Sequence, residues 1–138
     1  MTMTSSARLD ARLRGEPVDR IPNMGLVMQF AADQIGAPLR SYYLDYTVLS
    51  EANFVTAERF GLDLVDALSD PYREAHDFGA RIEFPPDGLP VSVEYLLADT
   101  DALASLPRPD PLSPGSRMRD RVDAVHLFHG PVGGRKTV

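Results

Sequence analysis

The residues best suited to chemistry in this chain are a serine and an aspartate that stand together, Ser69 and Asp70, directly before Pro71. They follow a short apolar run, residues 62–68, whose length suits a buried strand. A carboxylate at the end of such a strand is placed to meet a ligand. The same carboxylate could instead accept hydrogen bonds from free N–H groups of a helix that begins at Pro71. The residues alone leave both roles open.

The other acidic and histidine side chains indicate no catalytic or metal site. Asp63 and Asp66 stand three apart on the predicted strand, so they face opposite sides and should not work together. His126 and His129 have a metal-compatible spacing, but without a third ligand nearby they are interpreted as solvated surface residues. His76 is also interpreted as exposed.

Two further clusters have a structural interpretation. Three arginines alternate with acidic residues and are interpreted as a solvated helix face; they are Arg117, Arg119 and Arg121. Three tyrosines could line a pocket, although aromatic clusters more often pack; they are Tyr42, Tyr43 and Tyr46.

Composition bounds the class of protein. The chain has 138 residues, of which 43% are hydrophobic and 25% charged, as expected of one small soluble domain. It has no run of about eighteen apolar residues and no signal-like N-terminus, which favours a cytoplasmic protein with no membrane partner. The net charge is −6 and the basic residues are scattered, so a nucleic-acid surface is not expected. The absence of cysteine excludes a thiolate nucleophile and a sulfur-based zinc site.

The elements that must position these residues follow from periodicity and from capping residues. Helices are predicted over residues 5–14, capped by Ser5 or Ser6, and over 28–35, 45–60, 70–79, 99–106 and 116–133. Short apolar runs predict buried strands over 21–27 and 62–68, and alternation predicts a hairpin of 81–84 with 91–95. Residues 135–138 would begin another strand. This order indicates an α/β protein with a parallel sheet that is left with an open edge.

Four short motifs occur in order along the chain: Gly-Glu-Pro-Val-Asp-Arg-Ile-Pro at 15–22, Phe-Gly-Leu-Asp at 60–63, Leu-Ser-Asp at 68–70 and Phe-Gly-Ala at 78–80. Together, and from Leu9 onward, the chain resembles the uroporphyrinogen decarboxylase family, which includes decarboxylases and corrinoid-linked methyltransferases. The resemblance implies a (β/α)8 barrel, which needs roughly 250 residues. Residues 1–19 would then be an opening helix and turn. Residues 20–138 would be the first βα units, the hairpin excursion and the start of a third strand of a partial barrel.

The resemblance also implies roles for particular residues. Asp70 would be the catalytic acid that holds pyrrole N–H groups and stabilises a cationic intermediate, with Ser69 and Tyr72 as substrate contacts beside it. Decarboxylases carry Met-Arg-Gln-Ala-Gly-Arg after the first strand, whereas residues 27–32 here read Val-Met-Gln-Phe-Ala-Ala and lack both arginines. Met28 and Gln29 are therefore predicted to contact a smaller or more apolar ligand, as in the methyltransferase-like members, and Phe30 is predicted to be core.

Cofactor and partner expectations follow the same resemblance. Methyltransferase-like members bind zinc through a His-x-Cys pair and a later cysteine, which this chain lacks, so no metal site is predicted within it; zinc or a corrinoid could serve a full-length relative. The ligand would be a tetrapyrrole-related or methyl-donor small molecule. The chain by itself is expected to be inactive, since such a pocket needs loops from several strands. The alternatives are a homo-oligomer, a fragment that complements a chain with the missing strands, or a truncated relic without activity.

Overall fold

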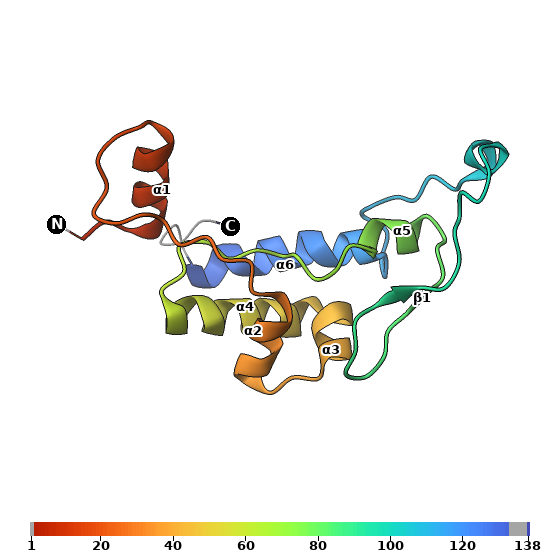
Figure 1. Cartoon of the computed structure of the whole chain (residues 1–138), viewed down its shortest axis with the longest axis horizontal. Coiled ribbons are helices and arrows are strands. Elements are labelled where there is room, and N and C mark those ends of the chain that lie inside the picture. The colour runs from red at the N-terminus through yellow and green to blue at the C-terminus, as the bar shows by residue number, and fades with distance from the viewer. Residues whose placement is uncertain (1, 133–137) are drawn as a thin grey trace.

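The protein is an elongated, helix-rich molecule. The computed structural model describes residues 2–132 and 138, without the side chains of 131 and 132. Helix α1 (Ser5–Leu13) lies at one end and a small hairpin with the 3-10 helix η1 (Asp101–Ser105) lies at the other (Figure 1). Between them lie α2 (Met28–Ile35), α3 (Leu39–Leu44), α4 (Tyr46–Phe60), α5 (Arg73–Asp77) and α6 (Arg117–Val132). Across the described part of the chain, no helix is long and apolar enough to cross a membrane.

Local capping explains where the central helices begin and end. Helices α2 and α4 end at Gly36 and Gly61, whose φ angles of 64° and 63° are left-handed and therefore favour glycine. Helix α4 begins after Asp45, whose carboxylate accepts a hydrogen bond from the Thr47 N–H at 2.8 Å. The predictions for these two helices are confirmed. The prediction of Ser5 or Ser6 as the cap of α1 is wrong by one or two residues, because the side chain of Thr4 accepts the capping hydrogen bond from the Ala7 N–H.

The core lies where α2, α3 and α6 pack against α4. Leu49 on α4 and Phe128 on α6 are fully buried there, together with Val65 from the segment after α4. Tyr42 and Tyr43 are also buried, with their rings edge-on and their centroids 5.7 Å apart. The packing interpretation is therefore confirmed for both tyrosines, and Tyr43 in addition lines a small cavity, which was the alternative.

The two predicted buried strands are not regular strands. Residues 21–27 and 62–68 lie side by side, and the Asp63 N–H donates to the Asn23 carbonyl at 2.7 Å. The prediction that 21–27 is buried on both faces is wrong, since Ile21 and Leu26 are 79% and 63% exposed. Pro22 has no N–H, and the Asn23 N–H donates to the Asp63 carboxylate at 2.8 Å. Neither residue therefore donates a backbone hydrogen bond to a neighbouring strand. A parallel sheet is absent from the described residues.

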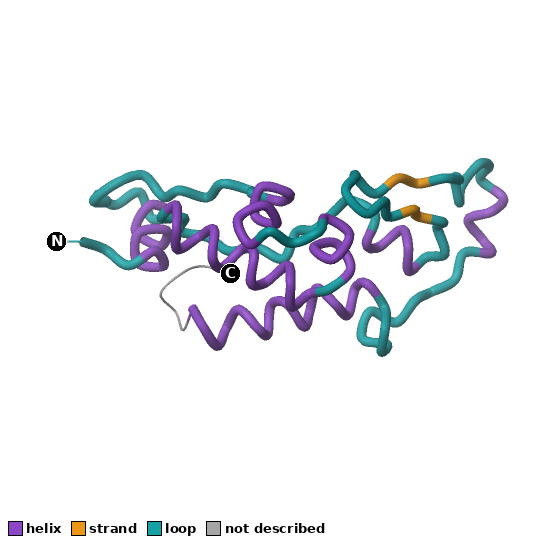
Figure 2. The backbone as a smooth tube through the Cα atoms, turned by 90° about the horizontal axis from the view of Figure 1, so that it is seen from below, coloured by secondary structure: helices purple, strands orange, loops and turns teal. Residues whose placement is uncertain are grey.

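The hairpin is confirmed, but it is short. Strands β1 (Ile82–Glu83) and β2 (Val91–Ser92) pair antiparallel, with Ile82 opposite Ser92 (Figure 2). They form the sheet of the described chain, at the end of the molecule away from α1. A strand beginning at 135 and a helix end at 133 both fall on residues 133–137, outside the described residues.

Two helix predictions need correction, and one helix was not predicted. The helix predicted over 99–106 is the 3-10 helix η1, and the one predicted over 70–79 is the shorter α5. Helix α3 was missed, because Gly36 and Pro38 indicate only a helix end and give no sign that a new helix begins directly after Pro38. The prediction for α6 is confirmed at its start, where the Arg119 N–H donates to the predicted cap, Ser116.

A second cap reaches α6 from another helix. Asp77, at the end of α5, accepts hydrogen bonds from the N–H groups of Arg117 and Met118 at 3.0 and 2.7 Å. We expect Asp77→Ala to lower the free energy of unfolding by about 1–2 kcal/mol, because it leaves these N–H groups without their acceptor. Urea denaturation followed by circular dichroism measures the change. Asp33→Ala, on the exposed side of α2, is the matched control, and equal losses in both variants would contradict the capping role.

Candidate functional site

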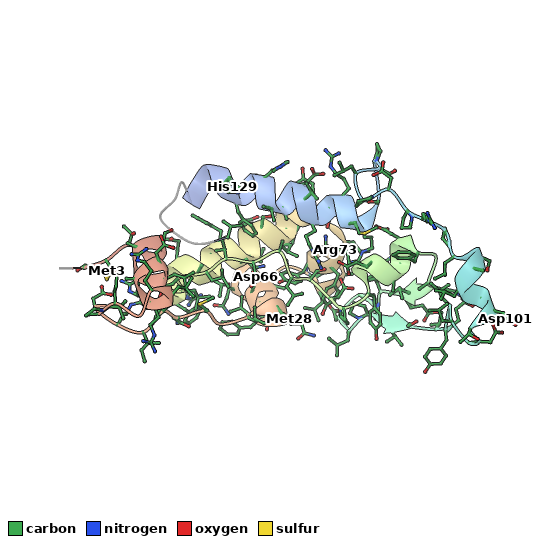
Figure 3. All side chains as sticks on the ribbon, turned by 90° about the horizontal axis from the view of Figure 1, so that it is seen from above. Met3, Met28, Asp66, Arg73, Asp101 and His129 are labelled. Carbon is green, nitrogen blue, oxygen red and sulfur yellow. The ribbon has the colours of Figure 1, made fainter. Side chains whose placement is uncertain are left out.

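A small cavity brings most of the predicted site residues together. It has a volume of about 150 Å³ and lies between the start of α2, the end of α3, the turn at 69–72 and the hairpin loop. It is lined by Met28, Tyr43, Ser69, Asp70, Pro71, Tyr72, Leu89 and Pro90. Two segments about forty positions apart in the chain therefore contribute predicted site residues to one cavity wall: Met28 from the first, and Ser69, Asp70 and Tyr72 from the second. Figure 3 shows Met28 and Arg73 in the middle of the molecule, far from Met3 and Asp101 at its two ends.

Gln29 lies beside this cavity and not in its wall. Burial raises the pKa of the Tyr43 hydroxyl, and the Gln29 side chain is close enough to oppose that rise. The Tyr43 hydroxyl is buried and has no hydrogen-bond partner of regular geometry among the described residues. Gln29 is thus adjacent to the predicted pocket through Tyr43.

The Asp70 carboxylate is 2% exposed and accepts four hydrogen bonds. Its Oδ1 accepts from the Tyr72 N–H at 2.9 Å and from Arg117 Nη1 at 3.1 Å. Its Oδ2 accepts from the Ser69 hydroxyl and from Arg117 Nη2, both at 2.6 Å. A carboxylate has about four lone-pair positions. In this arrangement no acceptor position of Asp70 remains for a ligand.

Arg117 is the partner of the cavity acid that the sequence interpretation missed. It is buried, and its guanidinium pairs with both oxygens of Asp70, donates to the Tyr43 carbonyl at 2.9 Å and lies 4.8 Å from the Phe84 ring centroid. The prediction of a solvated face is therefore wrong for Arg117. Arg119, by contrast, forms a part-exposed pair with Asp123 on the same helix.

A second buried arginine, Arg73, contacts the same turn at 69–72 and links it to α6. Arg73 is fully buried and donates to the Ser69 hydroxyl at 2.7 Å, to the Arg117 carbonyl at 3.0 Å and to Asp120 at 2.9 Å. Ser69 therefore receives a hydrogen bond from Arg73 while donating one to Asp70. The three segments that meet at the cavity are joined by this chain of contacts.

Electrostatics keep Asp70 ionised. Burial by itself raises the pKa of an aspartate, but the hydrogen bonds from Arg117 and Ser69 outweigh it and hold the pKa of Asp70 below its usual value. The stability that this pair contributes is present above the pKa of the unfolded chain and is lost as pH falls through the lower folded value. Asp70 faces the cavity and accepts a hydrogen bond from the Tyr72 N–H in the turn before α5. The prediction that it caps a helix beginning at Pro71 is wrong, because α5 begins at Arg73 and has no side-chain cap.

Met28 has an unusual backbone. Its φ angle of 37° makes it the one described residue other than glycine with a positive φ. Such a conformation is strained for a side chain of this size, and strain of this kind tends to occur at functional sites. Phe30, two residues on, is 47% exposed and packs on Phe60 at the surface, so its prediction as core is wrong.

The remaining acidic and histidine candidates stay apart from the cavity. Asp63 is buried at the other end of the segment and pairs with Arg8 and Arg20 at 2.5 Å. Burial opposes these contacts, yet hydrogen bonds led by that from Arg20 lower the pKa of Asp63 to about 2. Asp63 thus ties α1 to the body and does not act with Asp66, as predicted.

All three histidines are exposed, as predicted; they are His76, His126 and His129. Within residues 2–132 and 138, no three His, Cys, Asp or Glu side chains form a group that could hold a metal ion. A second, larger groove of about 600 Å³ lies beyond Tyr72, between α5, β2 and η1. Tyr72 is the predicted site residue that lines both hollows.

Comparison with known proteins gives a family and a fold. The family described as uroporphyrinogen decarboxylase (URO-D) matches residues 4–138. A search of curated proteins finds no match. Among solved structures, a methyltransferase from Methanosarcina mazei superposes with a TM-score of 0.71 at 20% sequence identity. The similarity covers 97% of this chain and 40% of that chain, so this chain spans less than half the length of its structural relative.

The buried pair predicts a large effect of removing its cation. We expect Arg117→Met to lower the free energy of unfolding by about 3–5 kcal/mol, because it leaves the Asp70 charge buried without its partner. Urea denaturation measures the change. Arg119→Met removes a part-exposed pair from the same helix, and its loss should stay below about 1 kcal/mol. Similar losses in both variants would mean that Arg117 is not part of a buried pair.

Proposed function

Because the chain belongs to the uroporphyrinogen decarboxylase family, we propose that it forms the N-terminal βα part of a barrel enzyme and that the cavity beside Asp70 belongs to the ligand site. In such barrels the active site lies at the carboxyl ends of the strands. Met28 follows the segment 21–27 and Asp70 follows the segment 62–68, which would be the first two strands. Their shared cavity supports this assignment.

The charge of the cavity favours a ligand that is not a polyanion. Arg117 is the cation in contact with the cavity acid, and both of its terminal nitrogens are already bonded to Asp70. The position where decarboxylases of the family carry an arginine holds Met28. Carboxylates of a porphyrinogen would therefore enter without a counter-charge, and unpaired buried carboxylates cost several kcal/mol each. This engagement of Arg117 is the observation that carries the proposal.

We therefore propose a small methyl-carrying or weakly charged ligand, as in the methyltransferase-like members of the family. A volume of about 150 Å³ suits a small group or one end of a ligand and is below the range usual for whole ligands. The Methanosarcina mazei protein of similar fold is named a methyltransferase, which agrees with a methyl-carrying ligand.

In the arrangement seen here, Asp70 would contribute a negative charge that its hydrogen bonds hold in one position at this site. Its four hydrogen bonds leave it no acceptor position, so it could hold N–H groups of a ligand, as the family resemblance implies, only after Arg117 has moved away. Arg117 would then be the positioning residue that keeps the acid ionised and in place. Ser69 and Tyr72 would fix its two oxygens from the side of the turn.

The residues of this chain do not fit a zinc ion of the kind that methyltransferase-like members bind. The sequence has no cysteine, and the three histidines lie on the surface away from the cavity. No step of the proposed chemistry is assigned to a metal. If a zinc or a corrinoid takes part, its ligands would come from residues outside this chain.

A binding experiment with a polyanionic macrocycle tests the proposed ligand class. Uroporphyrin, with its carboxylate groups, is titrated into the whole chain and followed by its absorbance. We expect Met28→Arg to bind it at least about tenfold more tightly than the wild-type chain, because a guanidinium at the cavity supplies the missing counter-charge.

Met24→Arg is the matched control, since Met24 is an exposed methionine outside the cavity wall. An equal gain in both arginine variants would show that the charge acts from anywhere on the surface. Tight uroporphyrin binding by the wild-type chain, or its decarboxylation of uroporphyrinogen, would contradict the proposal.

A further inference from the structure

The Tyr43 hydroxyl differs from the hydroxyl of its neighbour Tyr42. Tyr42 has the usual arrangement of a buried tyrosine, because its hydroxyl donates to the Leu68 carbonyl at 3.3 Å and accepts from the Asn53 amide at 3.1 Å. Tyr43 is 1% exposed, yet its hydroxyl has no hydrogen-bond partner of regular geometry among the described residues. A buried polar group of this kind lowers stability. The hydroxyl of Tyr43 therefore needs an explanation other than the stability of the fold.

The Tyr43 side chain reaches the cavity beside Asp70. Tyr43 belongs to the cavity wall together with Met28 and Asp70. Burial raises the pKa of its hydroxyl, the Gln29 side chain opposes that rise, and the Asp70 charge adds to it. Because Asp70 acts on the hydroxyl itself, the hydroxyl lies near the acid that faces the cavity.

The other buried polar groups of the cavity wall are already bonded. Asp70 accepts four hydrogen bonds, and the Ser69 hydroxyl donates to Asp70 and accepts from Arg73. The remaining wall residues are apolar apart from the half-buried Tyr72; they are Met28, Pro71, Tyr72, Leu89 and Pro90. A ligand in this cavity would therefore meet mainly apolar side chains and one buried hydroxyl that has no partner in the described chain.

We propose that Tyr43 is a specificity-determining residue of this site, and that its hydroxyl donates a hydrogen bond to a neutral oxygen of the ligand, such as a carbonyl or ether oxygen. The inference rests on the proposed function, because it requires that the cavity belong to the ligand site. It deepens that function by naming the ligand class: a small, mostly apolar and uncharged group with one acceptor oxygen.

The charges around Tyr43 select a neutral acceptor over a carboxylate. A phenol with a raised pKa stays protonated and can donate its hydrogen. A ligand carboxylate would lie near the ionised Asp70, and like charges at short distance disfavour each other. Both terminal nitrogens of Arg117 are already bonded to Asp70, so Arg117 does not offset that repulsion. A neutral oxygen avoids this cost and still satisfies the hydroxyl.

Two probes of the same shape test the proposal: cyclopentanone, which has a carbonyl oxygen, and methylenecyclopentane, which has a CH2 group in its place. Each is titrated into the whole chain, and NMR of 13C-labelled methionine methyl groups reports binding at Met28 in the cavity wall. We expect Tyr43→Phe to bind cyclopentanone at least about tenfold more weakly than the wild-type chain does. Its affinity for methylenecyclopentane should be unchanged or higher, because the wild-type hydroxyl gains no partner from that probe.

Tyr42→Phe is the matched control, since it removes the hydroxyl of the adjacent buried tyrosine, which lies outside the cavity wall. It should bind cyclopentanone like the wild-type chain but melt at a lower temperature, because it loses two hydrogen bonds. Tyr43→Phe should melt no lower than the wild-type chain, because its hydroxyl is unpaired. A purely structural role of the Tyr43 hydroxyl would give the opposite result in both measurements.

The outcomes separate this inference from the proposed function. Cyclopentanone that shifts the Met28 signal and binds the wild-type chain and Tyr43→Phe equally would overturn the role of Tyr43 and leave the ligand site in place. A Tyr43→Phe chain that melts well below the wild-type chain would also overturn that role. If neither probe shifts the Met28 signal of the wild-type chain, the assignment of the cavity to the ligand site fails, and this inference fails with it.

Discussion

The buried ion pair between Asp70 and Arg117 is the contact on which the geometry of the cavity depends. It joins the turn after the segment 62–68 to the first residue of α6, and Arg117 also contacts the Tyr43 carbonyl and the Phe84 ring. A buried charge that loses its partner is strongly destabilising, so both members must be present for either to be tolerated. The acid that the family resemblance implies for catalysis is therefore also a structural residue.

Helices α2 and α4 were predictable because their signals are local. Asp45 and Gly61 fix the ends of α4 through contacts within a few residues, and the structure has them where the sequence predicts them. Strands depend on neighbours that a local pattern does not contain. Segment 21–27 has the composition of a strand, yet without a ladder it is an irregular segment with exposed apolar side chains. The exposed apolar side chains of this segment and the failed strand prediction have this one cause.

The candidate site was predictable in part, as far as the residues that line the cavity are concerned. Ser69, Asp70 and Tyr72 are neighbours in sequence and Met28 came from the resemblance, and the four line one cavity. Arg117 was missed because an alternation of arginines and acids is typical of a solvated helix face. Its position carried a signal, since an arginine at the start of a helix opposes the helix dipole and needs a compensating anion. Asp70 and the capping Asp77 are the anions it meets.

The central claim is that Asp70 is an ionised acceptor held by Arg117, and titration of its carboxyl carbon by NMR in the whole chain tests it most directly. The pKa of Asp70 should lie below the value of about 3.9 for an unperturbed aspartate. The pKa of Asp70 should rise in Arg117→Lys, because a lysine keeps the positive charge but loses the bidentate contact with the carboxylate. A wild-type pKa above the unperturbed value, unaffected by that substitution, would contradict the account.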